Sequence, residues 1–369
     1  MYNDIVLSVI IPIKISHFNS FIYSRLEVFI EYFDRSPKIE YVIVDSTKIH
    51  RYSKSIEEKI NSIENTIYVN VDIEEPYSSA KARNSGSSVA NGKYLIFYDI
   101  DLIAKKNYFL EVLADTESLS KIGNKAFTIY PCLYLTKNYT NYLERNFDTR
   151  DLTDLSSELM TARSECLSGI KNKVLYPAIN TSTILVDRKH FINVGGYDED
   201  FSGHGYEDFF LIHVLSYYYS LSIKDKSYFR DDKTDYPGLY IGFRQYFSYY
   251  SLENLFKGRF TAHLYHDRNR QRVYYTKRDT NSTIFQSKLR KFGISSDNED
   301  YIIYENYQEF ISKIILKHGF SREDTKGLYR PLLSNDFNSR LYRLYRKSRK
   351  LLLNPRQFFI DIRFRKYQK

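Results

Sequence analysis

The feature that most constrains the fold is an unbroken and largely β-branched run at residues 6–11, which is closed by Pro12. The run lacks the regular polar and apolar alternation of a strand with one exposed face. Strands that are apolar on both faces are typical of parallel sheets, because helices cover both sides of such sheets. The run therefore predicts a buried parallel strand, with a helix to follow it.

Helical and extended patterns then alternate over the first hundred residues. Apolar residues recur near helical spacing at 18–33, and a second apolar run follows at 41–44. The same reasoning predicts helices at 57–63 and 78–90 and strands at 67–71 and 94–98. This order predicts an α/β domain with a mainly parallel sheet.

Polar or rigid residues follow three of the predicted strands: Pro12, Asp45 and the pair Asp99 and Asp101. Aspartate and proline are common wherever a strand turns into a loop, so each alone has an ordinary structural explanation. In open parallel sheets, however, ligands bind at the carboxyl ends of the strands. The shared placement of these residues favours a ligand site there.

Asp99 and Asp101 form an Asp-x-Asp pair directly after an apolar strand. Carboxylates with open coordination positions beside them favour Mg²⁺ or Mn²⁺, and such an ion is usually shared with substrate phosphates. The pair alone is a weak motif, so its surroundings decide its meaning.

Those surroundings are Ala82-Arg-Asn-Ser-Gly86, then Ala90-Asn-Gly92, then an apolar strand that leads into the Asp-x-Asp pair. This order resembles the family-2 glycosyltransferases of the GT-A fold. The resemblance implies a nucleotide-sugar donor, with Pro12, Asp45, Arg83 and Asp99 at the nucleotide and Asp101 at a Mn²⁺ or Mg²⁺ ion that bridges the diphosphate. The sequence departs from the family at 45–48, Asp-Ser-Thr-Lys, where a second acidic residue and Gly-Ser are frequent.

A second cluster extends from Asn180 to Asp208. It combines an expected strand at 183–186, a Gly-Gly helix end and a glycine-containing loop that can approach a ligand closely. The cluster resembles the galactosyltransferase-like C-terminal region, which implies an acceptor or sugar site that includes Asn180, Thr181 and His204. The usual residue at the position of His204 is tryptophan, a platform for sugar stacking.

Inverting glycosyl transfer needs a base on the face opposite the leaving nucleoside diphosphate. We expect Asp208 to be this base and Glu207 to orient the acceptor or the donor sugar. The alternative is that both carboxylates only stabilise the N-terminus of the helix that follows them.

Two histidines, His263 and His266, follow an apparent strand near residue 261. Members of the family commonly supply a histidine from this region to the metal site, which makes both residues candidates. His263 is favoured because it directly follows the strand end, and Arg268 and Arg270 are expected to reach phosphate oxygens.

The C-terminal quarter differs from the rest of the chain. We expect a transferase domain at 1–275, a helical extension and linker at 276–338 with a helix at 301–318, and a basic amphipathic tail at 339–369. The formal charge is +9, and 340–369 contains eleven basic residues and one acid, so the remainder is nearly neutral. This distribution argues against a nucleic-acid-binding surface, which would need basic residues interleaved with aromatics across a folded face.

The tail has two interpretations: it lies on an anionic membrane surface, or it docks on the domain with a solvated basic face. Residues 349–361 also resemble a tail that recurs in bacterial capsule and surface-polysaccharide transferases. We expect neither a signal peptide nor a membrane-spanning helix, because no basic region precedes the apolar stretch in 1–13 and no apolar run approaches the length of a span. The two cysteines are expected to be inert. Together these features predict a cytoplasmic enzyme that is peripheral on the inner face of the membrane.

The sequence therefore predicts an inverting glycosyltransferase that moves a hexose or N-acetylhexosamine from a nucleotide sugar, expected to be a UDP sugar. The expected acceptor is an oligosaccharide or lipid-linked glycan in bacterial capsular or surface polysaccharide synthesis. A sugar-nucleotide pyrophosphorylase would need a glycine-rich loop after the first strand, and 12–16 contains no glycine. A catalytically inactive scaffold of a capsule assembly complex is the remaining alternative.

Overall fold

The structure is a computed structural model, and it describes most of the chain. The described residues are 5–16, 21–31, 34–146, 152–231, 234–267, 273–294, 301–304, 306–329, 348, 351–352 and 355. The predicted tail at 339–369 lies outside the described residues apart from the four positions 348, 351, 352 and 355.

Two sheets form the centre of the described molecule. The larger one has six strands in the order β3-β2-β1-β4-β9-β6, and the smaller one has four in the order β5-β10-β7-β8. Strands β1 to β4 are mutually parallel, whereas β9 is antiparallel to both of its neighbours. The predicted α/β fold with a mainly parallel sheet is confirmed. The strands are β1 Leu7–Ile13, β2 Ile39–Asp45, β3 Thr66–Asn70, β4 Tyr94–Phe97, β5 Leu102–Ile103, β6 Phe127–Ile129, β7 Cys132–Leu135, β8 Val174–Ala178, β9 Ile184–Asp187 and β10 Thr261–His263.

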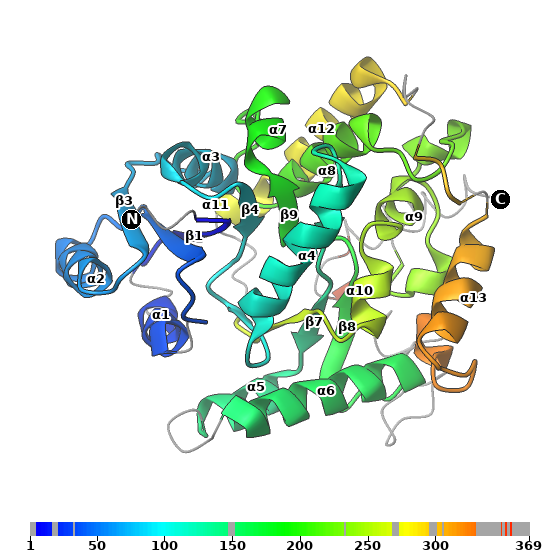
Figure 1. The fold of residues 1–369 in the computed structure, drawn as a ribbon, viewed down its shortest axis with the longest axis horizontal. Coiled ribbons are helices and arrows are strands. Elements are labelled where there is room, and N and C mark those ends of the chain that lie inside the picture. Colours follow the sequence, from blue (N-terminus) through cyan, green and yellow to red (C-terminus); the bar gives the residue numbers. More distant parts are fainter. Residues whose placement is uncertain are drawn as a thin grey trace.

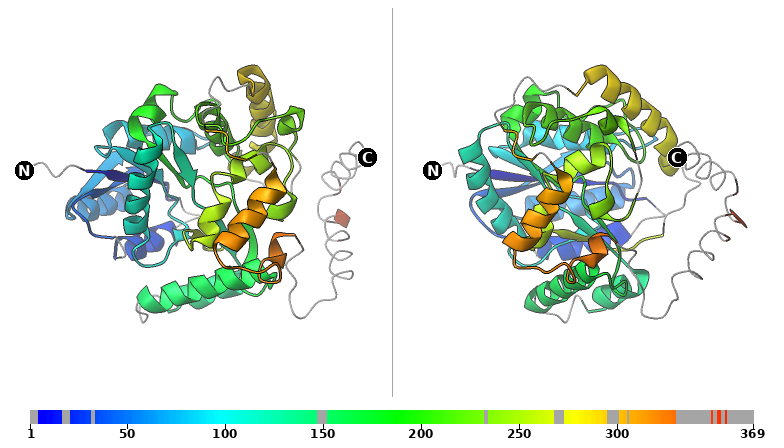
Figure 2. Two further views of the ribbon diagram at one scale, coloured as in Figure 1. Left: turned by 45° about the vertical axis from the view of Figure 1, so that its right-hand side comes forward. Right: turned by 90° about the vertical axis from the view of Figure 1, so that its right-hand side faces the viewer.

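Helices surround these sheets, with α1 and α2 at one end of the molecule and α13 at the other (Figure 1 and Figure 2). Within the described part of the chain, no helix has both the length and the apolar character needed to cross a membrane. The helices are α1 Phe21–Glu31, α2 His50–Asn61, α3 Ser79–Val89, α4 Tyr108–Ile122, α5 Lys137–Glu144, α6 Leu152–Ser168, α7 Arg188–Asn193, α8 Glu207–Tyr218, α9 Phe243–Ser248, α10 Leu252–Phe256, α11 Val273–Thr276, α12 Arg278–Phe292 and α13 Tyr307–Lys317.

The first strand is buried along its whole length, as the apolar run predicts. Pro12 is compatible with this central strand because β4 pairs only with residues Leu7 to Ile10 of β1. The carbonyl of Ile10 accepts the last hydrogen bond from that side, donated by the amide of Tyr98. Pro12 therefore lies beyond the end of β4, where no ladder hydrogen bond from its nitrogen is required.

Two predicted helix boundaries were wrong. The helix predicted at 57–63 is α2, which already begins at His50. Its start was missed because its first two turns are mostly polar and only Ile56 and Ile60 are buried. The helix predicted at 301–318 begins at Tyr307. The Asn306 carboxamide accepts hydrogen bonds from the amides of Gln308 and Glu309 and so caps α13 there.

The glycine of the Ala-Arg-Asn-Ser-Gly sequence permits close packing of α3 on the sheet. A Cβ atom on Gly86 would lie 2.6 Å from Cγ2 of Ile10 and 2.7 Å from Cγ2 of Val44. Glu40, buried in β2, fixes the turn between α3 and β4. It accepts hydrogen bonds from the hydroxyl of Ser8 at 2.6 Å and from the amide of Asn91 at 2.5 Å. These contacts hold α3 and the start of β4 against β1 and β2.

Adding one methyl group at Gly86 tests this packing. We expect Gly86→Ala to lower the free energy of unfolding by about 1–3 kcal/mol, because the core around Ile10 and Val44 would be overpacked. The same change at an exposed helix position stabilises by about 1 kcal/mol, so the sign of the effect is informative. Urea denaturation measures it, with Ser88→Ala on the exposed face of α3 as the control; a stabilised Gly86→Ala would contradict the packing.

Candidate active site

The carboxyl ends of β1, β2 and β4 meet at one edge of the larger sheet, as predicted. Pro12 and Asp45 occupy adjacent strands there, with Pro12 opposite Val44 and Ile13 opposite Asp45. Asp99 follows β4 by two residues. Three of the four predicted donor residues, Pro12, Asp45 and Asp99, therefore share one edge of the sheet.

Asp45 is fully buried, and both of its carboxylate oxygens accept hydrogen bonds within the chain. One accepts from the amide of Thr47 at 2.8 Å, and the other accepts from the hydroxyl of Tyr68 at 2.9 Å. These bonds fix the loop after β2 against β3. The predicted contact of Asp45 with a nucleotide stays a prediction.

Arg83 joins the two motif clusters. Its guanidinium donates to Asp99 at 2.8 Å through Nη2 and to Asp208 at 2.9 Å through Nη1, and Nη1 also lies 3.5 Å from Oε1 of Glu207. Arg83 is only 3% exposed and packs on the ring of Tyr197. A buried cation is costly unless it is paired, and three carboxylates satisfy that requirement here.

Asn84, the next residue of the motif, holds the loop that follows α7. Its side-chain oxygen accepts from the amide of Tyr197 at 2.9 Å, and its nitrogen donates to the Tyr197 carbonyl at 2.8 Å and to Glu199 at 2.9 Å. Gly196 precedes this contact with a φ of +67°, and a Cβ there would lie 2.7 Å from the Asn84 oxygen. The Gly-Gly-Tyr and Ala-Arg-Asn motifs are thus parts of one contact.

Glu207 and Asp208 begin α8 and face α3. The hydroxyl of Ser79 donates to Oε1 of Glu207 at 2.9 Å, whereas Oε2 of Glu207 is buried without a hydrogen-bond partner among the described residues. Burial and the neighbouring Glu207 charge raise the pKa of Asp208 well above its usual range, although Arg83 opposes the shift. A carboxylate with a raised pKa is a stronger base, which is the property that proton abstraction from a hydroxyl requires.

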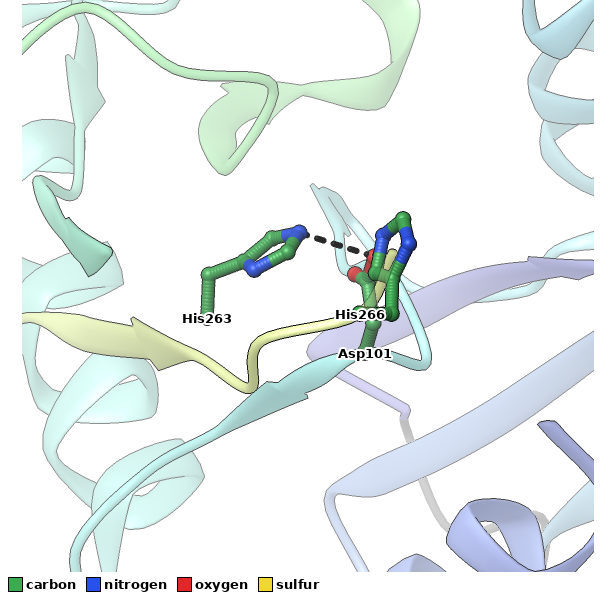
Figure 3. A group of neighbouring side chains, drawn as sticks. All are labelled: Asp101, His263 and His266. Carbon is green, nitrogen blue, oxygen red and sulfur yellow. Dashed lines mark ion pairs between the residues drawn. The ribbon is translucent and has the colours of Figure 1, made fainter. Parts of the chain in front are cut away.

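A second group of side chains lies where the two sheets meet. Oδ2 of Asp101 is 3.0 Å from Nε2 of His263 and 3.3 Å from Nε2 of His266. Figure 3 shows the three side chains together. One potential ligand atom from each residue lies within 4.8 Å of the other two. The backbone fixes the approach, because His263 in β10 pairs with Leu102 in β5 and the amide of Leu264 donates to the Asp101 carbonyl at 2.9 Å.

These three residues fit a divalent metal ion. One carboxylate oxygen and two imidazole nitrogens provide a mixed donor set that suits transition metals better than Mg²⁺, which prefers oxygen ligands. Burial acts to raise the pKa of Asp101, but the charges and hydrogen bonds of His263 and His266 outweigh it and lower that pKa well below its usual range. The sequence left open which histidine binds metal, and the structure places both beside Asp101.

The predicted acceptor residues lie on two different loops. Asn180 donates to the carbonyl of Arg244 at 3.0 Å, and its side-chain oxygen is buried without a partner in the described chain. Thr181 donates to the carbonyl of Tyr130 at 2.7 Å. Nε2 of His204 lies 2.8 Å from Nη1 of Arg278, at the start of α12.

Helix α12 holds the loop that carries His204. Nδ2 of Asn281 donates to the carbonyls of Ser202 and Gly205, each at 3.0 Å. Lys288 forms ion pairs of 2.6 Å with both Asp198 and Asp200. Helix α12 therefore contacts the loop before α8 directly, and the predicted domain boundary at 275 stays a prediction. Arg268 and Arg270, which were expected to reach phosphate oxygens, lie outside the described residues.

Sequence reasoning missed Ser79 and Ser182. The Ser182 hydroxyl donates to Oδ2 of Asp99 at 2.8 Å, opposite the oxygen that binds Arg83. Ser79 precedes Arg83 by four residues and shares its face of α3. The helical spacing was therefore a signal for Ser79, whereas nothing local indicated the contact of Ser182 with Asp99.

The cysteines have no part in this site. Cys132 and Cys166 are free and buried, and burial raises the pKa of each thiol to about 12. Thiols that remain protonated are poor nucleophiles and metal ligands.

The parallel sheet, the Asp-x-Asp pair at its carboxyl edge and the histidines beside Asp101 define an enzyme class, the glycosyltransferases of the GT-A type. The family model described as glycosyltransferase like family 2 matches residues 8–291. The chain belongs to this family.

Solved structures with similarity to the chain are distant. TarS 1–349 of S. aureus is 15% identical with a TM-score of 0.36, over 58% of this chain and 56% of that chain. The mannosyltransferase PcManGT of Pyrobaculum calidifontis, in complex with GDP-Man and Mn²⁺, is 17% identical with a TM-score of 0.34, over 57% of this chain and 51% of that one. The chain thus spans about half the length of these proteins, and no curated protein sequence matches it.

The raised pKa of Asp208 predicts a pH dependence of stability. The folded state binds the Asp208 proton more tightly than the unfolded chain, so the stability from this proton is complete below the unfolded pKa of about 4 and is lost as pH rises. Asp208→Asn removes this loss. We expect the free energy of unfolding of Asp208→Asn, relative to wild type, to increase as the pH rises above about 4.

Urea denaturation at several pH values measures this difference. Asp279→Asn, an exposed change in α12, controls for the loss of one carboxylate. A difference between Asp208→Asn and wild type that stays constant with pH would show that the pKa of Asp208 is not raised.

Proposed function

We propose that the protein is an inverting glycosyltransferase that moves a hexose or N-acetylhexosamine from a nucleotide sugar, with UDP as the preferred nucleotide. The observation that carries the proposal is the Arg83 bridge, which holds Asp99 and Asp208 on one buried guanidinium. Asp99 belongs to the donor-side motif and Asp208 to the acceptor-side motif. One side chain thereby fixes the two halves of a transfer site relative to each other.

The chemistry is a single displacement at the anomeric carbon. An acceptor hydroxyl oxygen forms the new glycosidic bond, the bond to the nucleoside diphosphate breaks, and Asp208 takes the hydroxyl proton. The raised pKa of Asp208 suits this role, and the unpartnered Oε2 of Glu207 is available to accept a hydrogen bond from a sugar hydroxyl.

Asp101, His263 and His266 would hold Mn²⁺ or Mg²⁺ in this function, with Mn²⁺ favoured by the two imidazoles. When bound, the ion supplies Lewis-acid neutralisation of the charge on the departing diphosphate. The protein contributes rigidity, because His263 lies in β10 and its ring stacks on Tyr134 at 4.4 Å.

The remaining predicted contacts belong to the same proposal. Pro12, Asp45, Arg83 and Asp99 would line the nucleotide part of the donor site. Asn180, Thr181 and His204 would face the acceptor or the transferred sugar, and the unpartnered oxygen of Asn180 supports a polar ligand there.

Asp101→Ala tests the proposed function. We expect it to abolish Mn²⁺-dependent hydrolysis of the nucleotide sugar, measured as nucleoside diphosphate release across a panel of donors, because the metal site loses its only described carboxylate. Asp324→Ala, at an exposed turn, should retain the wild-type rate. Full activity of Asp101→Ala would overturn the metal assignment, and a wild type that hydrolyses no donor would favour the inactive scaffold.

The acceptor and its location form a further part of the proposal. We propose a growing bacterial capsular or surface glycan, free or lipid-linked, and a cytoplasmic enzyme that binds the inner face of the membrane through its basic tail. The support is the charge of 340–369, with eleven basic residues and one acid. Basic segments with apolar faces bind anionic leaflets.

Truncation after Asn338 tests the membrane contact. We expect the full chain to float with vesicles that contain anionic lipids and the truncated protein to lose this binding. High salt should also release the full chain, because screening weakens electrostatic binding to the surface. Undiminished flotation of the truncated protein would remove the proposed role of the tail.

A further inference from the structure

The two histidines beside Asp101 are fixed in different ways. His263 is the last residue of β10, and the strand pairs on both sides, with β5 and β7. His266 lies three residues beyond the end of β10 and is therefore not held by the pairing of that strand. Its backbone therefore needs another source of order if Nε2 is to stay 3.3 Å from Asp101.

Arg25 of α1 provides one such contact. Its Nη2 donates to the carbonyl of Tyr265 at 3.1 Å, and this carbonyl belongs to the peptide bond that leads into His266. Arg25 is only 7% exposed although α1 is a surface helix. Burial of a guanidinium is costly unless close partners bind it, so the contacts of Arg25 account for its buried position.

Helix α5 binds the backbone N–H of Tyr265, the residue whose carbonyl Arg25 binds. The amide of Tyr265 donates to the hydroxyl of Thr140 at 2.8 Å. Glu144, one turn further along α5, accepts from Nη2 of Arg25 at 2.9 Å. The backbone of Tyr265 is thus held at its N–H by α5 and at its C=O by α1, and the ion pair of Arg25 with Glu144 joins the two helices.

The side chain of His266 also contacts α1. The ring of Phe21 stacks on the imidazole with a centroid distance of 5.6 Å and an angle of 26° between the planes. The guanidinium of Arg25 lies 4.6 Å from the centre of the Phe21 ring. Phe21 and Arg25 are four residues apart and share one face of the helix, so one turn of α1 orders both the backbone and the ring of His266.

We propose that Arg25 is a positioning residue for the metal site, acting through the Tyr265 carbonyl to fix His266. The inference rests on the proposed metal-dependent function. Groups that orient a metal ligand, without touching the metal, typically change metal affinity by 10- to 100-fold when they are removed. In this arrangement α1 controls the occupancy of a site to which it contributes no ligand.

A double-mutant cycle on the full chain tests the inference, with the dissociation constant of Mn²⁺ measured by electron paramagnetic resonance of the free ion. We expect Arg25→Gln to weaken Mn²⁺ binding about tenfold in the wild-type background. In a His266→Ala background the same change should weaken binding less than about twofold, because its effect passes through His266. Equal losses in both backgrounds, or no loss in the first, would overturn the inference.

Arg163→Gln is the matched control. Arg163 is 8% exposed and also donates to backbone carbonyls, those of Leu255 and Phe256 at the end of α10. The Arg163→Gln substitution should leave the affinity for Mn²⁺ unchanged. If it weakened binding as much as Arg25→Gln does, loss of a buried arginine would be the cause and the inference would fail.

Thr140 provides a second route if Arg25→Gln does not fold. Thr140→Val removes the acceptor of the Tyr265 amide at nearly constant volume and should also weaken Mn²⁺ binding, whereas Thr140→Ser keeps the hydroxyl and should restore it. Equal affinities for these two variants would contradict the inference. Mn²⁺ binding by wild type and its loss in Asp101→Ala test the proposed function separately from all of these comparisons.

Discussion

The arrangement of the site depends on the burial of one cation, Arg83. A guanidinium that is 3% exposed has lost its water, and only close carboxylates offset that cost. Asp99 comes from the loop after β4, and Glu207 and Asp208 come from the start of α8. Because all three bind the same side chain, α3, the Asp-x-Asp loop and α8 have one mutual arrangement.

The neighbours of Arg83 in the motif each act on a different part of the structure. Gly86 lets α3 approach β1 and β2, Asn84 holds the loop at Tyr197, and Ser79 orients Glu207. A short motif thereby places one helix against the sheet and two loops at once. The ion pair of Arg83 with Asp208 and the packing at Gly86 are linked through a helix of 11 residues.

The sequence predicted those features that local patterns carry. Apolar runs predicted the parallel strands, and the placement of Asp99 and Asp101 after one of them predicted an acidic site at the sheet edge. The start of α13 was missed because it depends on the cap at Asn306 rather than on apolar spacing. The hydrogen bond from Ser182 to Asp99 and the one from Arg25 to Tyr265 were not predictable, since each requires knowledge of how distant segments pack.

The two histidines show the same limit. A spacing of three residues does not reveal where the chain turns after β10, so the sequence could not decide between His263 and His266. The turn is set by α1 and α5, which bind Tyr265 from both sides. Tertiary contacts of the intervening residue, rather than the histidines themselves, bring the second imidazole to Asp101.

The contact of Asn281 with the loop at 202–205 has a consequence for synthesis of the chain. Residues 1–101 contain strands β1 to β4 and the Asp-x-Asp pair, and they leave the ribosome early. The loop before Asp208 lacks its anchor until α12 has emerged, close to 180 residues later by the numbering of Asp101 and Asn281. A nascent chain therefore forms the strands that precede Asp101 well before His263 and His266 can reach Asp101 and before Asn281 can hold the loop at 202–205, so the complete arrangement forms late in synthesis.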